Sequence, residues 1–353
     1  FFKLSPDETL KAVQTLYERK LVTYPRTDAR VLSTAVAKEI DKNLSGLCQY
    51  EHGGAYASHI LEKGGYKKLS SSRYVNDQQI TDHYAVIPTG QGLSALKGVS
   101  PVLQNVYEII VRRFLSIFYP AAEYQKISIV SKIGKESFFT TDKQLIKEGY
   151  LSLLKYSFAK KNDEKDRDAD GEAQSRTPAD FADIIKNIKK GTILSVTDMK
   201  IKESETAPPK RYNSGTMILA MENAGQLIED EELRAQIKSS GIGTSATRAE
   251  ILKKLVTIKY LALNKKTQII TPTQLGENVY DTVDCSIRSL LNPELTASWE
   301  KGLTYVAEGT ITSETYMKKL DDFIQRRVYG VIGLNNQYEL RQKFLQTAKN
   351  YKK

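Results

Sequence analysis

Cysteine and long apolar runs are what this chain most clearly lacks. Cys48 and Cys285 are the two cysteines, and they lie far apart in the sequence. Such a pair supports neither a disulfide framework nor a zinc ribbon, so we expect a reducing compartment such as the cytoplasm. No apolar run approaches the roughly 20 residues needed to span a bilayer, and no signal peptide is present. These shortages predict a protein without a membrane partner.

Histidine is also scarce, with three residues in the chain. His52 and His59 lie near Cys48 in the sequence, and the three together suggest a metal site. Tetrahedral zinc needs a full set of ligands, and this neighbourhood does not supply the rest. We interpret these side chains as ordinary surface or core residues.

Length and positive charge are what the chain does have. Its 353 residues are too many for one ordinary hydrophobic core, so we expect two or three domains. The formal net charge of +10 suits a polyanionic partner such as nucleic acid, although it would serve solubility equally well. The first residue is Phe1 and not methionine, which suggests a piece of a longer protein.

Residues 23–28, with the sequence TYPRTD, concentrate the groups that phosphate chemistry needs. Pro25 fixes its own φ and pushes Tyr24 out of the helical region, so the backbone here should be stiff and extended. Alternate residues of an extended chain share a face, so Tyr24 and Arg26 would point the same way. A phosphate that meets the phenol oxygen would then also meet the guanidinium fork. The stretch predicts a phosphoryl-transfer site with Tyr24 as its nucleophile.

Hydrophobic periodicity predicts a mainly helical chain with a smaller β component. Capping signals and apolar spacing predict helices at residues 5–20, from 33 or 34, 103–118, 214–225, 244–256 and 292–308, and an amphipathic helix with a frayed end in the tail. Alternation and turn signals predict strands at residues 124–133, from 138 and at 193–201, and a hairpin over 261–270. Between these regions, residues 206–211 read as an extended linker.

The helix expected after the turn at residues 241–243 has a functional and a structural interpretation. Thr244 is a good N-cap, as Ser214 is for the helix before it. A helix that begins at a glycine turn offers N–H groups to a phosphate, and Thr247 and Arg248 add a hydroxyl and a cation in its first turn. Capping alone explains the threonines equally well.

Other conspicuous side chains fit structural roles when taken alone. Met217, Met221 and Trp299 lie at core spacing, which favours burial over ligand binding or base stacking. His83 would more often be a structural histidine than a functional one.

An acidic run at residues 166–172 resembles both the start of a calcium-binding EF-hand loop and the acidic magnesium motif of a TOPRIM domain. The twelfth position of the EF-hand loop would be Thr177 instead of glutamate. No apolar strand precedes the run, and it follows the tyrosine motif instead of preceding it. We expect a solvated loop and assign no metal ligands.

Five motifs occur in the order found in one enzyme family. The motifs are TYPRTD (residues 23–28), DHYAVIPT (82–89), PPKRYNSGTMILAMENAG (208–225), GIGTSATRAEIL (241–252) and LTASWEKGL (295–303). In these motifs and their order the chain resembles the type IA DNA topoisomerases. Thr244 stands where the topoisomerase I branch has arginine, which favours a resemblance to the topoisomerase III branch.

The resemblance implies an α+β, mainly α fold that belongs to a toroidal core. Residues 1–100 would form a helical domain that carries the catalytic tyrosine, and residues 101–207 part of an antiparallel β arch. Residues 208–353 would form a helical, winged-helix-like DNA-binding domain.

The resemblance also implies roles for the motif residues. Tyr24 would become joined to the 5′ phosphate of a cut strand, with Arg26 stabilising the charge that develops there. His83 would contact the phosphate or the DNA, and Thr247 would contact the strand. Arg248 and Thr244 are added as DNA-binding candidates from the helix start.

The implied reaction needs no ATP, because the phosphotyrosine link retains the energy of the broken bond while another strand passes. A phenol has a pKa of about 10 and needs help to attack at neutral pH. In the family that help includes Mg2+ held by a TOPRIM domain, which would precede residue 1 and is absent. We therefore expect this chain alone to bind single-stranded DNA without relaxing supercoils.

The implied partner is single-stranded or underwound DNA in the cytoplasm and nucleoid, handled by a monomer, with a helicase as a candidate second partner. A non-catalytic winged-helix DNA-binding protein is the alternative. It explains the charge and the module at residues 214–270, but it leaves TYPRTD unexplained. Tyrosine recombinases and rolling-circle relaxases need arginine, histidine or metal-binding sets that do not precede Tyr24.

Overall fold

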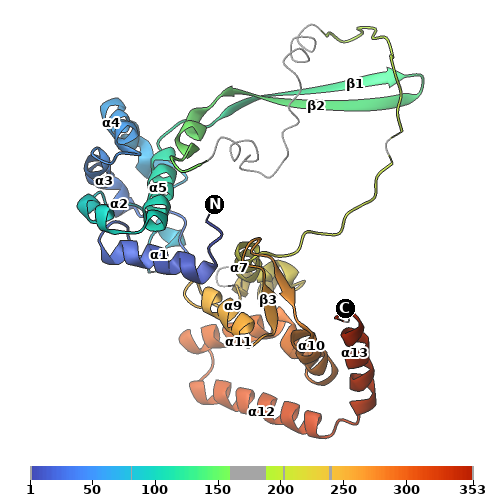
Figure 1. The fold of residues 1–353 in the computed structure, drawn as a ribbon. Coiled ribbons are helices and arrows are strands. Elements are labelled where there is room, and N and C mark those ends of the chain that lie inside the picture. Colours follow the sequence, from blue (N-terminus) through green and yellow to red (C-terminus); the bar gives the residue numbers. More distant parts are fainter. Residues whose placement is uncertain (1, 81, 160–187, 202, 238–240, 352–353) are drawn as a thin grey trace. The chain divides into compact units, whose positions relative to one another are not determined.

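The computed structural model describes residues 2–80, 82–159, 188–201, 203–237 and 241–351 (Figure 1). Helices dominate, and the strands of the described residues form two antiparallel pairs, which confirms the predicted α+β, mainly helical class. The chain forms two compact units. The first comprises residues 15–24 and 29–209, and the second residues 2–14, 25–28 and 210–353.

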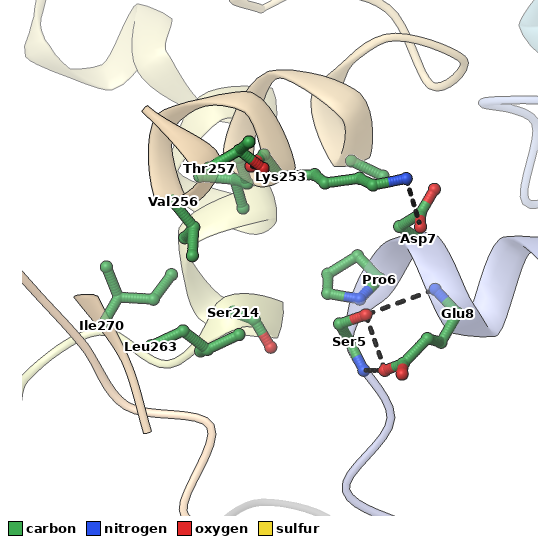
Figure 2. A pocket seen from close by; sticks show the side chains of 12 residues that line it. Ser5, Pro6, Asp7, Glu8, Ser214, Lys253, Val256, Thr257, Leu263 and Ile270 are labelled. Carbon is green, nitrogen blue, oxygen red and sulfur yellow. Dashed lines mark hydrogen bonds and ion pairs between the residues drawn. The ribbon is translucent and has the colours of Figure 1, made fainter. Parts of the chain in front are cut away.

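Helix α1 (Pro6–Glu18) begins as its sequence predicts. The backbone N–H and the hydroxyl of Ser5 both donate to Glu8 Oε2 at 2.7 Å, and Pro6 occupies the first turn (Figure 2). These two hydrogen bonds hold the pKa of Glu8 below its ordinary value. The predicted helix is confirmed, although it ends at Glu18 and not at residue 20.

Helix α1 is divided between the units, since its residues up to Gln14 belong to the second unit and the rest to the first. The other described helices and 3₁₀ turns of the first unit are short to medium in length. They are α2 (Thr34–Lys38), α3 (Ile40–Leu47), α4 (Gly54–Lys63), α5 (Pro101–Ser116), η1 (Gly65–Ser71), η2 (Asp77–Gln79), η3 (Leu93–Gly98) and η4 (Gly149–Leu154). The helix predicted from residue 33 or 34 begins at Thr34 with Ser33 as its cap, but it is divided at Glu39. Ile40 and Leu44 are completely buried in the core of this unit.

A buried ion pair within α5 supports the contact between α5 and η4. Arg112 Nε lies 2.7 Å from Glu108 Oε1, and both side chains are buried. Ser157 donates its N–H and its hydroxyl to Glu108, and Arg112 donates to the Leu153 carbonyl. Because each charge has polar partners, this pair meets the condition under which a buried ion pair is tolerated.

Strands β1 (Glu123–Ile133) and β2 (Glu136–Lys147) form a long hairpin around the predicted turn, with Ile133 opposite Glu136 (Figure 1). The predicted strand at residues 193–201 is wrong. Those residues have no strand conformation, and Ile193 is 95% exposed. Apolar alternation makes a strand only where another strand pairs with its backbone, and no described strand does so here.

The second unit is built from helices and one small hairpin. Its elements are α7 (Ser214–Glu222), η6 (Ala224–Leu227), α8 (Glu231–Ile237), α9 (Arg248–Thr257), β3 (Leu261–Leu263), β4 (Ile270–Pro272), α10 (Gln274–Ser286), η7 (Arg288–Leu291), α11 (Pro293–Ala307), α12 (Ser313–Ile332) and α13 (Gln337–Lys349). The predicted hairpin over residues 261–270 is confirmed, with strands that end at Pro272.

The start of α7 corrects one prediction. Asn213, not Ser214, is the N-cap, and it forms a reciprocal capping box with Thr216. Ser214 is the first helical residue and is buried, because its hydroxyl donates to Gln268 Oε1 at 2.9 Å beside β4. The helix ends at Glu222, one turn before the glycine predicted to stop it.

Helix α11 begins at the predicted position, where Asn292 caps it. Trp299, for which core spacing predicted burial, is half-buried, and its ring packs edge-on against Tyr316 and Phe323 at 5.6 Å. The tail forms two helices, α12 and α13, instead of one helix with a frayed end.

Within the described ranges, no helix is both long enough and apolar enough to cross a bilayer. Those ranges also hold no group of three or more His, Cys, Asp or Glu side chains placed to bind a metal ion. The acidic run at residues 166–172 lies outside the described residues.

Candidate active site

Two short segments far apart in the sequence pair beside the tyrosine motif in the first unit. Thr23 N–H donates to the Ile87 carbonyl and Thr89 N–H donates to the Leu21 carbonyl, each at 3.0 Å. Val22 and Pro88 form the antiparallel bridge between them. This pairing fixes the backbone immediately before Tyr24 against the motif of residues 82–89.

The side chain of Thr23 strengthens the same pairing. Its hydroxyl accepts the Ile87 N–H at 3.0 Å and donates to the Ala85 carbonyl at 3.4 Å. Ala85 N–H in turn donates to the Val31 carbonyl at 2.9 Å, so residues 85–87 contact both the first residue of the motif and the chain beyond its end. The sequence analysis did not single out Thr23, and a β-branched residue before a tyrosine gives little signal by itself.

This arrangement brings Tyr24 and His83 together. Their ring centroids are 4.5 Å apart with a 45° angle between the planes, and Tyr17 also packs edge-on against Tyr24 at 5.4 Å. Tyr24 is half-buried and His83 is exposed. The two aromatic contacts restrict the phenol ring, and the exposed imidazole lies beside it, where a phosphate on the phenol could reach it.

Arg26 and Asp28 belong to the second unit, and both side chains are exposed to solvent. The expectation that Tyr24 and Arg26 share one face stays a prediction. Asp28 has a definite partner, because its Oδ1 lies 3.2 Å from Arg248 Nη1. Sequence reasoning gave Asp28 no role, although a carboxylate four residues after the tyrosine was a visible signal.

The turn before α9 depends on two glycines in the left-handed region, Gly241 with φ +63° and Gly243 with φ +68°. A Cβ on Gly241 would lie 2.5 Å from the Glu222 carbonyl oxygen. Ile242 N–H donates to the Met221 carbonyl at 2.8 Å. The turn is therefore packed directly on the end of α7, which only glycine permits.

Thr244 and Thr247 share one local hydrogen-bond system, which corrects the predicted helix start. Thr247 is the N-cap residue of α9, and its hydroxyl accepts the Thr244 N–H at 2.9 Å. The Thr244 carbonyl accepts from the N–H groups of Thr247 and Arg248. Thr244 thus begins a turn that leads into the helix instead of capping it, and both threonines remain exposed.

Arg248 differs from the threonines, because it is 3% exposed. Its guanidinium donates to the carbonyls of Ile242 and Gly243 at 3.2 and 3.0 Å, in addition to its contact with Asp28. A cation predicted to face DNA is therefore directed into the protein.

Comparison with known proteins decides the family. The family model described as DNA topoisomerase matches residues 1–318. The chain belongs to the DNA topoisomerase family. It is 32% identical over 342 residues to the DNA topoisomerase 3 of Bacillus licheniformis, which covers 96% of this chain and 44% of that protein. The DNA topoisomerase 3 of Bacillus subtilis is 34% identical over 331 residues, which covers 93% of this chain and 42% of the relative.

These matches confirm the resemblance to the topoisomerase III branch. The DNA topoisomerase 3 of Bacillus cereus is more distant, at 28% identity over 342 residues. The chain spans less than half the length of the curated relatives that it matches. The activity of a whole topoisomerase is therefore a proposal for the protein to which this chain belongs.

Proposed function

We propose that the protein containing this chain is a type IA topoisomerase of the topoisomerase III kind, which cuts one DNA strand through a 5′-phosphotyrosine link, passes another strand and reseals the cut. The observation that carries the proposal is the contact between Tyr24 and His83, built by the pairing of residues 21–23 with 85–89. The family match supports the reaction type.

The chemistry is a balanced exchange of one phosphodiester for another. The Tyr24 oxygen attacks the phosphorus and forms the phosphotyrosine bond while the bond to the 3′ oxygen breaks. The phenol proton leaves, and the departing 3′ oxygen takes up a proton to become a hydroxyl. That hydroxyl reverses the reaction, so no ATP is consumed. His83 and Arg26 are proposed to bind the phosphate and stabilise its developing charge.

The second unit is proposed to bind the strand. Thr244 and Thr247 are exposed at the start of α9, and α9 packs against α7 and strand β3 in a winged-helix-like group. The net charge of +10 suits single-stranded or underwound DNA. A direct DNA contact by Arg248 stays a prediction, and its buried contacts favour the different role argued below.

Magnesium does not fit the donors of the part of the chain that the structure describes. The described residues supply no group of three or more His, Cys, Asp or Glu side chains placed to bind a metal, so we assign the Mg2+ requirement of the reaction to a TOPRIM domain outside it. The toroidal architecture and the β arch are part of the same proposal. A helicase partner, a monomeric state and a location in the cytoplasm and nucleoid rest on the resemblance.

Covalent capture of DNA tests the proposal. The full-length protein is mixed with a labelled single-stranded oligonucleotide and Mg2+, denatured, and examined for a protein–DNA adduct. We expect an adduct with the natural protein and none with Tyr24→Phe, while DNA binding persists in both. A natural protein that binds DNA without an adduct would support the non-catalytic winged-helix alternative.

The isolated chain gives a second test. We expect it to shift single-stranded DNA in a gel but not to relax supercoiled plasmid with Mg2+, because the proposal places the metal-binding carboxylates in another domain. Relaxation by the isolated chain would contradict this assignment.

A further inference from the structure

Arg248 has the surroundings of a buried structural cation. All three of its side-chain nitrogens have protein acceptors: Nε donates to the Ile242 carbonyl, Nη2 to the Gly243 carbonyl and Nη1 to Asp28 Oδ1. The residue is 3% exposed, although it starts a helix on which neighbouring polar side chains are open to solvent.

We infer that Arg248 is a positioning residue, which acts through Asp28 to fix residues 25–28, the continuation of the nucleophile motif, on the turn of residues 241–243. The effect of this positioning on strand cleavage rests on the proposed function. The inference replaces a direct contact between this guanidinium and a DNA phosphate.

The geometry explains why one arginine can do this. A guanidinium is planar and rigid, so two fixed acceptors determine where its remaining donors point. The carbonyls of Ile242 and Gly243 belong to a turn packed on the end of α7, and they aim Nη1 at the Asp28 carboxylate. A phosphate would have to displace these acceptors from a site that excludes most solvent.

The ion pair is asymmetric in a way that strengthens the inference. The Asp28 side chain is 47% exposed, whereas that of Arg248 is 4% exposed. Removing the carboxylate therefore leaves a desolvated cation with fewer compensating partners, which costs more than breaking a pair of exposed charges. Asp28 is also accessible enough to be replaced without opening a cavity.

A second ion pair on α9 provides a matched comparison. Lys253 Nζ lies 3.2 Å from Asp7 Oδ2 (Figure 2). Lys11 shares that carboxylate at 3.0 Å. The Lys253 side chain is 56% exposed and that of Asp7 16%. A cavity of about 230 Å³ lies beside the pair, lined by residues 5–8, Ser214 and side chains of α9 and the hairpin. This pair joins α9 to α1, and here the carboxylate, not the cation, is the more buried partner.

The test uses the full-length protein and two separate measurements. Single-turnover cleavage of a labelled single-stranded oligonucleotide is measured for Asp28→Asn, Arg248→Gln and the double variant. We expect each single variant to cleave about tenfold more slowly and the double variant to be no slower than the slower single one, because coupled residues are not additive. The conservative Arg248→Lys should recover part of the rate, since it keeps the charge but not the fork.

The salt dependence of DNA binding distinguishes positioning from phosphate contact. Loss of one phosphate contact lowers the slope of log affinity against log salt by about 0.7 for single strands. We expect an unchanged slope for Arg248→Gln and Asp28→Asn. A lower slope for Arg248→Gln, together with normal cleavage by Asp28→Asn, would overturn the inference.

The controls separate this inference from the proposed function. Asp7→Asn, at the pair whose cations are exposed, should change cleavage less than twofold. Hydrogen exchange in residues 25–28 should rise in Asp28→Asn and Arg248→Gln whether or not the protein cleaves DNA, and unchanged exchange in both would refute the positioning role. If no adduct forms in the natural protein, the proposed function fails while the exchange result still decides this inference.

Discussion

The Tyr24–His83 region and the turn before α9 place their polar groups by opposite means. The first depends on backbone pairing between residues 21–23 and 85–89, and its histidine is exposed. The second is a local turn fixed by glycines, and its arginine is buried. The Tyr24–His83 region is formed by segments far apart in the sequence and leaves its imidazole exposed to solvent. The turn before α9 is formed by neighbouring residues and buries its guanidinium.

The difference shows that a basic residue in or beside a family motif does not by itself identify a phosphate ligand. His83 was proposed from the motif resemblance and Arg248 from the expected helix start, yet only His83 lies beside the nucleophile with its side chain open to solvent. A guanidinium whose donors already have buried acceptors loses those hydrogen bonds if it turns to a phosphate. Burial and partners therefore decide between the two roles.

Substitution of Gly241 should give the largest effect on stability. In Gly241→Ala the new Cβ meets the Glu222 carbonyl at 2.5 Å at a φ of +63°, so we expect a loss of about 3 kcal/mol. Gly134→Ala is the control, because Gly134 has a φ of +60° but nothing within 4 Å, and should cost about 1 to 2 kcal/mol. Thermal unfolding measures both. Equal losses would mean that the turn is not packed on α7 as described.

Substitution of Thr23 tests the long-range region and should have a smaller effect. Thr23→Ala removes the acceptor of the Ile87 N–H, which should cost about 1 kcal/mol, and should lower cleavage more than DNA binding because Tyr24 follows directly. Thr23→Ser keeps the hydroxyl and should retain most activity. Normal cleavage by Thr23→Ala would show that this pairing does not position the nucleophile.

Local structure was largely predictable from the sequence. Ser5 and Glu8 give the start of α1, and Asn292 gives the start of α11. The hairpin turn at Asn264 follows from its side chain, which accepts the N–H groups of Lys266 and Thr267. In each case the decisive hydrogen bonds join residues two or three positions apart, so a short window of sequence contains the whole interaction.

The site itself depended on contacts that such a window does not contain. Periodicity gives no reason for Thr23 to pair with Ile87, or for Asp28 to meet Arg248. Motif resemblance pointed to Tyr24 and His83 without supplying their geometry. The wrong strand at residues 193–201 has the same cause, because a strand needs a partner that its own sequence does not specify.

The smallest expected effect on stability belongs to the Ser5–Glu8 cap of α1, which is part of neither the Tyr24–His83 region nor the turn before α9. Hydrogen bonds from the Ser5 backbone and hydroxyl lower the pKa of Glu8, so their stabilisation is complete above the ordinary glutamate pKa and is lost as the pH falls through the lowered value. Glu8→Gln should therefore cost about 0.5 kcal/mol at pH 7 and progressively less toward pH 3. Thermal unfolding at both pH values measures the difference in the free energy of unfolding between the variant and the natural chain, which is the gap compared below. The exposed Glu62→Gln in α4 is the control, and a gap for Glu8→Gln that stays constant with pH would show that the carboxylate does not supply the cap.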